Sequence, residues 1–412
     1  MNGWVPLGVE MVAVAALCCA LGRHCRSVHV ATAVVAGTAA ALGARWALHN
    51  AGLSGEAAPW SLWAWTATTA FALTIAITGW RGRSGWWRHN AVLAASLCLL
   101  STGLVINGWI GYLPTVAVAR DQLLMRPLPH QIDWNAAAGM RARGERPRTG
   151  RLVAVDTGDR ASNFRHRTEW VYLPPSWFHD PGPAEPVVMM IGGEFTTAVD
   201  WVRAGQAVTT ADSYAAAHNG DAPVLVFADA SGSFTNDTEC VNGVRGRAAD
   251  HLTRDVVPAV ADRFGVGTDP RRWAVAGFSS GGTCAIDLAV MHPERFGRFV
   301  DIAGDERPNT GSQAQTVDRL FGGDRRAWAT FDPATAIAAH GPYRDSAGLF
   351  LVPESGRADS QAAQRLCGLG AVRGIKCSVT TLAGRHTWPF AAAAFEKALP
   401  WLAEPASLDD VS

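Results

Sequence analysis

One serine in the chain lies in a setting that could make it a nucleophile. Residues 277–282 read Gly-Phe-Ser-Ser-Gly-Gly; an apolar run, 273–276, precedes them and an Ala-rich segment of helical character follows. In the order strand, G-x-S-x-G, helix, the serine occupies a strained tight turn, and the flanking glycines let strand and helix approach closely. The motif occurs once, so Ser279 is predicted to be a nucleophile; an ordinary glycine-rich turn is the alternative.

A serine hydroxyl becomes reactive when a histidine removes its proton, and in this architecture the chain order is serine, acid, histidine. His386 follows a predicted strand, 378–381, and precedes the last predicted helix, which is where the base belongs. We therefore predict His386 as the base. Other histidines of this part of the chain are interpreted as surface or capping residues: His218, His251, His292 and His340.

The acid that orients the histidine must lie between Ser279 and His386, after a strand. Asp359 and Glu354 both follow the predicted strand 349–352. Asp359 is preferred because the chain needs some length to curl back toward His386. Asp305, which follows the preceding strand, is the third candidate.

An oxyanion hole requires two backbone N–H groups that point at the developing negative charge. One is predicted to be that of Ser280, directly after the nucleophile. The other comes from the loop after an earlier strand, here Gly192-Gly193-Glu194 after the run 187–191, which makes Glu194 the expected donor through its main chain. A plain Gly-Gly turn is the alternative reading of this loop.

Short β-rich runs alternate with longer helical segments, and this alternation predicts an α/β domain with a parallel sheet over residues 150–404. Chemistry in such sheets lies beyond the carboxyl ends of the strands, where the candidate residues fall. The clearest runs are 186–191, 223–228, 273–276, 296–302 and 348–352.

The first 115 residues have a different character. The chain is 48% hydrophobic and only 17% charged, and the apolar excess lies in this part. A helix needs roughly 20 apolar residues to cross the hydrocarbon core. Residues 1–115 are therefore predicted to form a transmembrane region, and residues 116–149, rich in Arg and Pro, a juxtamembrane linker. The four predicted spans are 4–22, 28–48, 59–80 and 91–113.

Basic residues in the short loops predict the orientation, because such loops stay on the cytoplasmic side. The loops between spans one and two and between spans three and four carry positive charge, whereas the loop with Glu56 carries little. Both termini, and with them the catalytic domain, are expected outside a multi-pass cell-membrane anchor. The basic residues concerned are Arg23, Arg26, Arg81, Arg83 and Arg88.

Four cysteines lie in the globular part, without the C-x-x-C spacing of a metal site. In an extracytoplasmic domain this even count suits two disulfides, Cys240 with Cys284 and Cys367 with Cys377, with four buried thiols as the alternative. No cofactor or metal is predicted. The formal net charge of +0 and the lack of a basic stripe argue against a nucleic-acid partner. No feature indicates an oligomeric state.

Taken together, these residues resemble the putative-esterase branch of the α/β-hydrolases, which contains the mycolyltransferases and the S-formylglutathione hydrolase-like esterases. The resemblance covers about residues 150–402 and rests on three segments. It implies an α/β-hydrolase fold, a triad of Ser279, His386 and Asp359, and oxyanion amides of Ser280 and Glu194. Four spans before such a domain are similar to membrane-anchored members of actinobacterial cell envelopes. The segments are 277–282, the loop 187–195 with Trp201 beyond it, and Gly384-Arg385-His386-Thr387-Trp388, similar to the family's G-x-H-x-W signature.

Two functions from different classes follow. The first is a cell-envelope serine ester hydrolase or acyltransferase that acts on lipid-like or acylated glycan esters through an acyl-enzyme. The alternative is a catalytically inactive, membrane-anchored binding or scaffold protein with a hydrolase fold. The complete order of serine, acid and histidine favours the enzyme.

Overall fold

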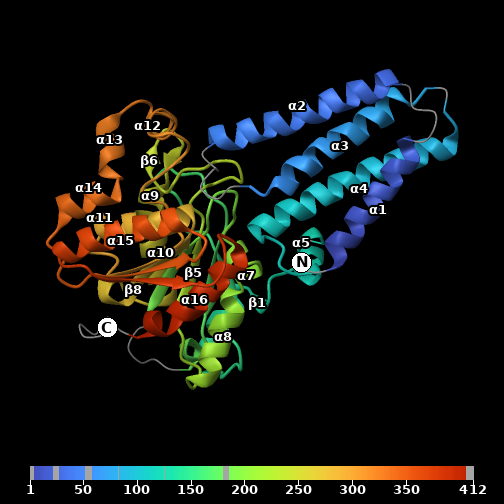
Figure 1. Cartoon of the computed structure of the whole chain (residues 1–412). Helices are drawn as coiled ribbons and strands as arrows, with labels where there is room; N and C mark the ends of the chain where they lie inside the picture. The colour runs from blue at the N-terminus through green and yellow to red at the C-terminus, as the bar shows by residue number, and fades with distance from the viewer. Residues whose placement is uncertain are drawn as a thin grey trace. The chain divides into compact units, whose positions relative to one another are not determined.

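The computed structural model describes residues 4–21, 27–51, 58–81, 83–124, 126–179 and 185–404. The chain divides into two compact units, Met1–Gln122 and Leu123–Ser412. Figure 1 shows the helices of the first unit and the sheet of the second. Each unit is described by itself.

Four helices of the first unit are long and apolar enough to cross a membrane, as predicted. The fourth begins six residues earlier than expected (85 rather than 91), so Arg88 lies in its first turn rather than in the preceding loop. A short helix, α5, follows. The helices are α1 (Trp4–Leu21), α2 (Ser27–Ala51), α3 (Trp60–Thr78), α4 (Gly85–Ile110) and α5 (Val116–Leu123).

Small residues allow these helices to pack closely. A Cβ atom on Gly37 of α2 would lie 2.7 Å from the carbonyl oxygen of Ala67 in α3. The Trp87 indole of α4 donates to the carbonyl oxygen of Ala20 in α1 at 2.8 Å. The predicted orientation depends also on Arg23, Arg26 and Glu56, which lie outside the described residues.

The second unit is built on a nine-stranded sheet in the order β1-β2-β3-β5-β4-β8-β9-β10-β11. Strands β5, β4, β8, β9, β10 and β11 run parallel, while β3 is antiparallel to both β2 and β5. This confirms the α/β class. The strands are β1 (Gln131–Ile132), β2 (Arg151–Val155), β3 (Glu169–Leu173), β4 (Val187–Ile191), β5 (Val224–Ala228), β8 (Trp273–Phe278), β9 (Arg298–Ile302), β10 (Ala347–Pro353) and β11 (Lys376–Leu382); β6 (Asn242–Gly243) and β7 (Gly246–Arg247) form a separate ribbon.

Helices cover both faces of this sheet (Figure 1). On one face α11 packs on β8 and β9, and α15 packs on β10 and β11; α8 and α16 lie together on the other. Every residue of the central strands β4, β5 and β8 is buried, which explains their unbroken apolar sequences. The helices are α6 (Trp134–Ala142), α7 (Asp200–Arg203), α8 (Ala207–Ala217), α9 (Ala248–Asp250), α10 (Val257–Phe264), α11 (Ser280–Met291), α12 (Gln313–Phe321), α13 (Arg325–Thr330), α14 (Pro333–His340), α15 (Arg357–Val372) and α16 (Trp388–Ala403); η1 (Ser176–Phe178) and η3 (Pro270–Arg272) are 3-10 turns, and η2 (His251–Val256) is a π-helical turn.

The predicted linker, 116–149, differs from the structure in its second half. Strand β1 pairs with β2 and thereby joins the sheet. In α6 the side chain of Ala137 is fully buried in the core of the domain, and the Trp134 ring packs edge-on against Phe264 at 5.3 Å between ring centroids. The few apolar residues of this segment are spaced too widely to be recognised as a core contribution without the partners they meet.

Two disulfides form the predicted pairs. Cys240 bonds to Cys284 of α11, and Cys367 of α15 bonds to Cys377 at the start of β11. The Cα–Cα distances are 5.6 and 5.7 Å, within the ordinary range for disulfides. The first bond fastens the loop after β5 to the helix that begins beside Ser279.

Candidate active site

Ser279 lies at the turn between β8 and α11, in the predicted order of strand, turn and helix. Its φ of 61° and ψ of −128° fall in a backbone region that residues other than glycine rarely adopt. Glycines on both sides permit the turn: a Cβ on Gly277 would lie 1.8 Å from the carbonyl oxygen of Gly281, and a Cβ on Gly281 would lie 2.4 Å from that of Ile191. Strand and helix therefore hold the serine at the carboxyl edge of the sheet.

The glycine loop after β4 lies directly against this serine. A Cβ on Gly193 would come within 2.9 Å of the Ser279 Cβ and 3.4 Å of its Oγ. The Thr196 hydroxyl donates to the carbonyl oxygen of Gly193 at 2.5 Å, which fixes the turn that carries Glu194. The structure thus brings together the loop and the predicted nucleophile, although Glu194 and Ser279 lie 85 residues apart in the sequence.

His386 reaches the same place from the far end of the chain. Its ring lies 4.9 Å from the ring of Phe278, the residue before Ser279, as measured between centroids. Its Nδ1 lies 4.0 Å from Oδ2 of Asp359, in the first turn of α15. This is ion-pair distance, longer than a hydrogen bond, and catalytic contacts of this kind commonly shorten when substrate binds.

The two other acid candidates lie differently. Glu354 is exposed at the end of β10, where its backbone N–H donates to the carbonyl oxygen of Leu382. Asp305 follows β9, and Asn309 donates to its carboxylate at 3.4 Å. Desolvation raises the pKa of Asp305, while Asn309 and the charge of His386 oppose the rise, so Asp305 and His386 share one electrostatic environment.

A fourth carboxyl, Asp301 of β9, is buried beneath the turn and was not predicted. A Cβ on either Gly282 or Gly304 would lie 2.4 Å from its Oδ1, so both glycines leave room for this group. Burial is the main cause that raises the pKa of Asp301 to about 7; the N–H of Gly304 opposes it. The signal was present in the sequence, because Asp301 stands between Val300 and Ile302 in the apolar second half of the run 296–302.

Arg167 is a second residue that sequence reasoning missed. Its guanidinium makes two bonds to the buried carboxylate of Asp229, at 2.6 and 3.1 Å, and donates at 2.9 Å to the carbonyl oxygen of Thr196 in the glycine loop. Burial raises the pKa of Asp229, but the bonds and charge of Arg167 outweigh it and hold that pKa below its usual value. Arg167 therefore positions the loop that carries Glu194.

Substituting Arg167 with lysine should lower kcat for ester cleavage by about 10²-fold, because a lysine cannot bond Asp229 and Thr196 together and a small displacement of an oxyanion donor is costly. KM should change little, since Arg167 acts through the loop. Steady-state kinetics on the purified full chain measure both values. Arg373→Lys is the matched control: Arg373 also donates to a backbone carbonyl, that of Ala338, but far from Ser279. Equal kcat in the two variants would refute the positioning role.

The mouth of the site combines an aromatic pair with a neutral acid. Phe195 and Phe234 are 38% and 51% exposed, and their rings lie 5.8 Å apart. Beside them, burial raises the pKa of the Glu194 carboxyl to about 8; Asp237 adds to the rise and Arg245 opposes it. The segment 234–240 lies beside the Gly192-Gly193-Glu194 loop.

The Glu194 carboxyl should set an alkaline limit on activity. It is neutral below a pH of about 8 and negative above it. A negative charge beside the predicted oxyanion donors would oppose the developing oxyanion, so kcat should fall by up to about 10-fold as pH rises through that value. Glu194→Gln keeps the backbone N–H and should lose this limb of the pH profile. The exposed Glu294→Gln should retain it; a limb that persists in Glu194→Gln would assign it elsewhere.

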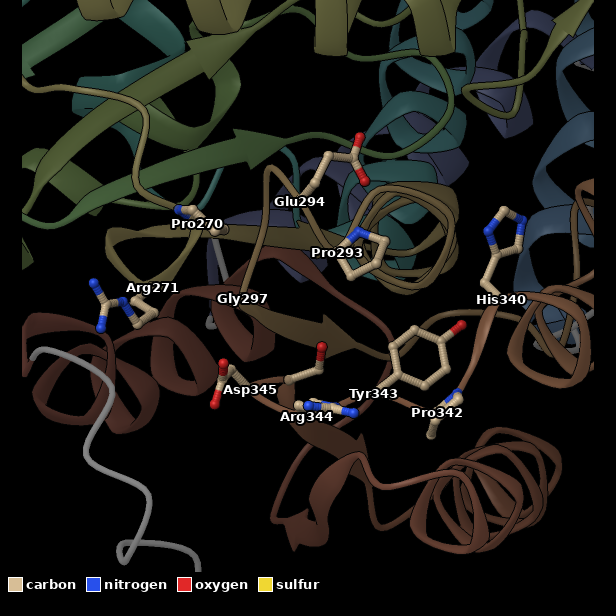
Figure 2. A pocket seen from close by; sticks show the side chains of 11 residues that line it. Pro270, Arg271, Pro293, Glu294, Gly297, His340, Pro342, Tyr343, Arg344 and Asp345 are labelled. Atoms are coloured by element: carbon tan, nitrogen blue, oxygen red, sulfur yellow. The ribbon is translucent and has the colours of Figure 1, made fainter.

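A separate pocket of about 330 Å³ lies at the opposite edge of the sheet (Figure 2). Pro270, Gly297 and Ser346 of its wall lie just before β8, β9 and β10. The amino ends of parallel strands lie opposite the carboxyl edge, where Ser279 is found. This pocket is therefore not part of the candidate active site.

Comparisons with known proteins agree with this geometry. Residues 162–364 match the family model described as putative esterase. An uncharacterised protein of Corynebacterium glutamicum is 28% identical over 365 residues, which cover 85% of this chain and 83% of that protein. The MPT51 antigen of Mycobacterium leprae is 30% identical over 136 residues, 30% of this chain and 42% of that protein.

Among solved structures, an S-formylglutathione hydrolase of Agrobacterium tumefaciens superimposes with a TM-score of 0.53 at 17% identity, over 63% of this chain and 97% of that one. At this identity the likeness concerns the fold. It agrees with the mixed sheet covered by helices on both faces. The globular domain of this chain therefore has the α/β-hydrolase fold, and its residues 162–364 match the putative-esterase family model.

Proposed function

We propose that this protein is a serine carboxylic-ester hydrolase or acyltransferase of the cell envelope that acts through an acyl-enzyme. The observation that carries the proposal is the strained turn at Ser279, with the Gly193 loop against it and the ring of His386 on the neighbouring Phe278. Ser279 is the nucleophile, His386 the base and Asp359 the acid.

In the proposed reaction the Ser279 Oγ attacks the acyl carbonyl while His386 takes its proton. Asp359 holds the imidazole in the required orientation and stabilises its positive charge. The backbone N–H groups of Ser280 and Glu194 bind the tetrahedral oxyanion. His386 then returns the proton to the leaving alcohol, which leaves the acyl group on Ser279. Water or an acceptor alcohol, activated by His386, releases the acyl group and restores the enzyme.

The mouth of the site suits an apolar acyl group. Exposed apolar side chains that contact each other often mark binding sites, and Phe195, which contacts Phe234, directly follows the proposed oxyanion donor Glu194. An acyl chain bound to Ser279 could lie along the rings of Phe195 and Phe234. This supports lipid-like or acylated glycan esters as the substrate class, presented by the membrane that anchors the chain.

An extracytoplasmic domain is supported by two independent features. Two disulfides are typical of oxidising compartments. Arg81 and Arg83 lie between the third and fourth apolar helices and Arg88 lies in the first turn of the fourth, and such basic residues favour the cytoplasmic side for that connection. Protease treatment of intact cells that carry a C-terminally tagged chain should digest the domain; protection of the tag until the cells are lysed would contradict this orientation.

The proposal is tested by reaction of the detergent-purified full chain with a fluorophosphonate probe, which bonds to activated serines. Wild type should be labelled, and Ser279→Ala should not. Ser346→Ala, at the opposite edge of the sheet, is the control and should label like wild type. A folded wild type that takes no label would favour the inactive scaffold instead. With envelope lipid extracts, release of free acid identifies a hydrolase and a new ester identifies an acyltransferase.

A further inference from the structure

Three side chains outside the candidate active site converge on one point. Oε1 of Glu169, at the start of β3, lies 3.0 Å from Nδ1 of His166 and 3.0 Å from Nε2 of His251. All three ligand atoms lie within 4.8 Å of one another. Glu169 and His251 are fully buried, and the His166 side chain is 12% exposed. The prediction that His251 is a surface or capping residue is therefore wrong.

His251 lies between two carboxylates. Its Nε2 faces Glu169, and its Nδ1, which has no hydrogen-bond partner among the described residues, lies 3.6 Å from Oδ2 of Asp255. A neutral imidazole has one N–H. Either tautomer therefore leaves a nitrogen lone pair directed at a carboxylate. A cation between His251 and Glu169 removes this conflict, because Nε2 then binds the cation and Nδ1–H points toward Asp255.

The surroundings resemble those of bound metals. A histidine that binds a metal usually directs its other nitrogen to a carboxylate, and ligating carboxylates are themselves hydrogen-bonded. Asp255 is held by the backbone N–H groups of Ala161 and Ser162, and the Thr157 hydroxyl donates to the second oxygen of Glu169 at 3.1 Å. The π-helical turn η2 brings Asp255 beside His251, and such turns are frequent at functional sites.

We propose that His166, Glu169 and His251 bind a divalent first-row transition-metal ion, zinc in preference. Ligand atoms about 2.1 Å from one ion at angles near 90–110° are roughly 3.0–3.4 Å apart, which the two 3.0 Å distances match. Two imidazoles and one carboxylate form a ligand set that suits zinc. The carbonyl oxygen of Arg167, 3.0 Å from Nδ1 of His166, or a water entering beside the partly exposed His166, completes the coordination.

The ion would fasten β3 to η2 through Glu169 and His251, which are 82 positions apart in the sequence. Its ligands His166 and Glu169 flank Arg167, which bonds the glycine loop through Thr196. The metal therefore stabilises the support of the oxyanion loop without touching substrate. Metal content is measured without a substrate. Failure of the metal proposal is therefore distinguishable from failure of the proposed esterase activity.

The experiment is equilibrium dialysis of the chelator-stripped, detergent-purified full chain against Zn²⁺ with a weak competing chelator, followed by metal analysis. Wild type should retain about one Zn²⁺ per chain. Glu169→Gln, which keeps the shape of the side chain, and His166→Gln, at the partly exposed ligand, should each lose it. His292→Gln is the matched control: His292 pairs with Glu294 at 3.3 Å but outside the cluster, and this variant should retain zinc.

Two further readouts keep the test decisive if a variant folds poorly. Co²⁺ in place of zinc should give visible ligand-field absorption in wild type and in His292→Gln. Zinc should raise the Tm of wild type, because a ligand that binds only the folded state stabilises it. Wild type that retains no zinc, or Glu169→Gln that retains as much as wild type, would overturn the proposal and leave a proton shared between the histidines and Glu169 as the explanation of the cluster.

Discussion

Replacing His386 with alanine should lower kcat/KM for an activated ester by at least about 10³-fold. Without the imidazole, nothing at this position removes the proton of Ser279, and a hydroxyl at neutral pH is a poor nucleophile. The strained turn and the glycine loop do not depend on His386, so KM should change little. Steady-state kinetics across neutral and alkaline pH, with circular dichroism to confirm the fold, measure the effect.

Chemical rescue with added imidazole tests the role of His386 more directly in the same variant. The His386 side chain is 27% exposed, so a small base can enter the space it leaves. Imidazole should restore part of the activity of His386→Ala and none of that of Ser279→Ala. His292→Ala, at the partly exposed histidine that follows α11, should match wild type. Activity of His386→Ala within about 10-fold of wild type would remove His386 from the mechanism.

Among the three acid candidates, Asp359→Asn should cause by far the largest loss, about 10³–10⁴-fold in kcat. Asn cannot stabilise the imidazolium and favours the wrong tautomer of His386. Asp359 lies 4.0 Å from Nδ1 of that ring. The fluorophosphonate labelling rate should fall in parallel, because it depends on the same activation of Ser279.

Two matched amide substitutions complete this comparison. Glu354→Gln should be close to wild type, because Glu354 is exposed at the end of β10. Asp305→Asn should cost less than Asp359→Asn, because it removes only a neighbouring charge. If Asp305→Asn instead shows the largest loss, the acid lies after β9 and Asp359 has a supporting role. Equal and small effects in all three would leave Asp301 as the next carboxyl to test.

Local patterns were enough to predict the parts of the site that lie at chain turns. The G-x-S-x-G segment between an apolar run and an Ala-rich run predicts the turn at Ser279, because that turn has strict requirements on both neighbours. The loop 192–194 and the G-x-H-x-W segment are similarly confined to a few residues. The apolar helices and the central buried strands were also visible, since their signals extend over many consecutive positions.

Contacts between distant segments could not be predicted in this way. Strands β2 and β3 pair antiparallel at the side of the sheet and lack the long apolar runs of the buried strands. The positioning role of Arg167 can be recognised only when Asp229 and Thr196 are seen to bond to it. His251 in isolation is indistinguishable from a surface histidine, because Glu169 and Asp255 approach it from β3 and from the next helical turn. Each of these needs the folded arrangement.

The disulfide between Cys240 and Cys284 makes completion of the candidate active site depend on the redox state of the compartment that holds the domain. In a reducing cytosol both sulfurs stay as thiols, and the segment that begins at Phe234 is left without its covalent bond to α11, the helix that follows Ser279. Under the proposed function, a newly made molecule would then be a poor catalyst toward lipid-like esters inside the cell that makes it. Competence would arrive only after export and oxidation, and recombinant preparations should follow the same route.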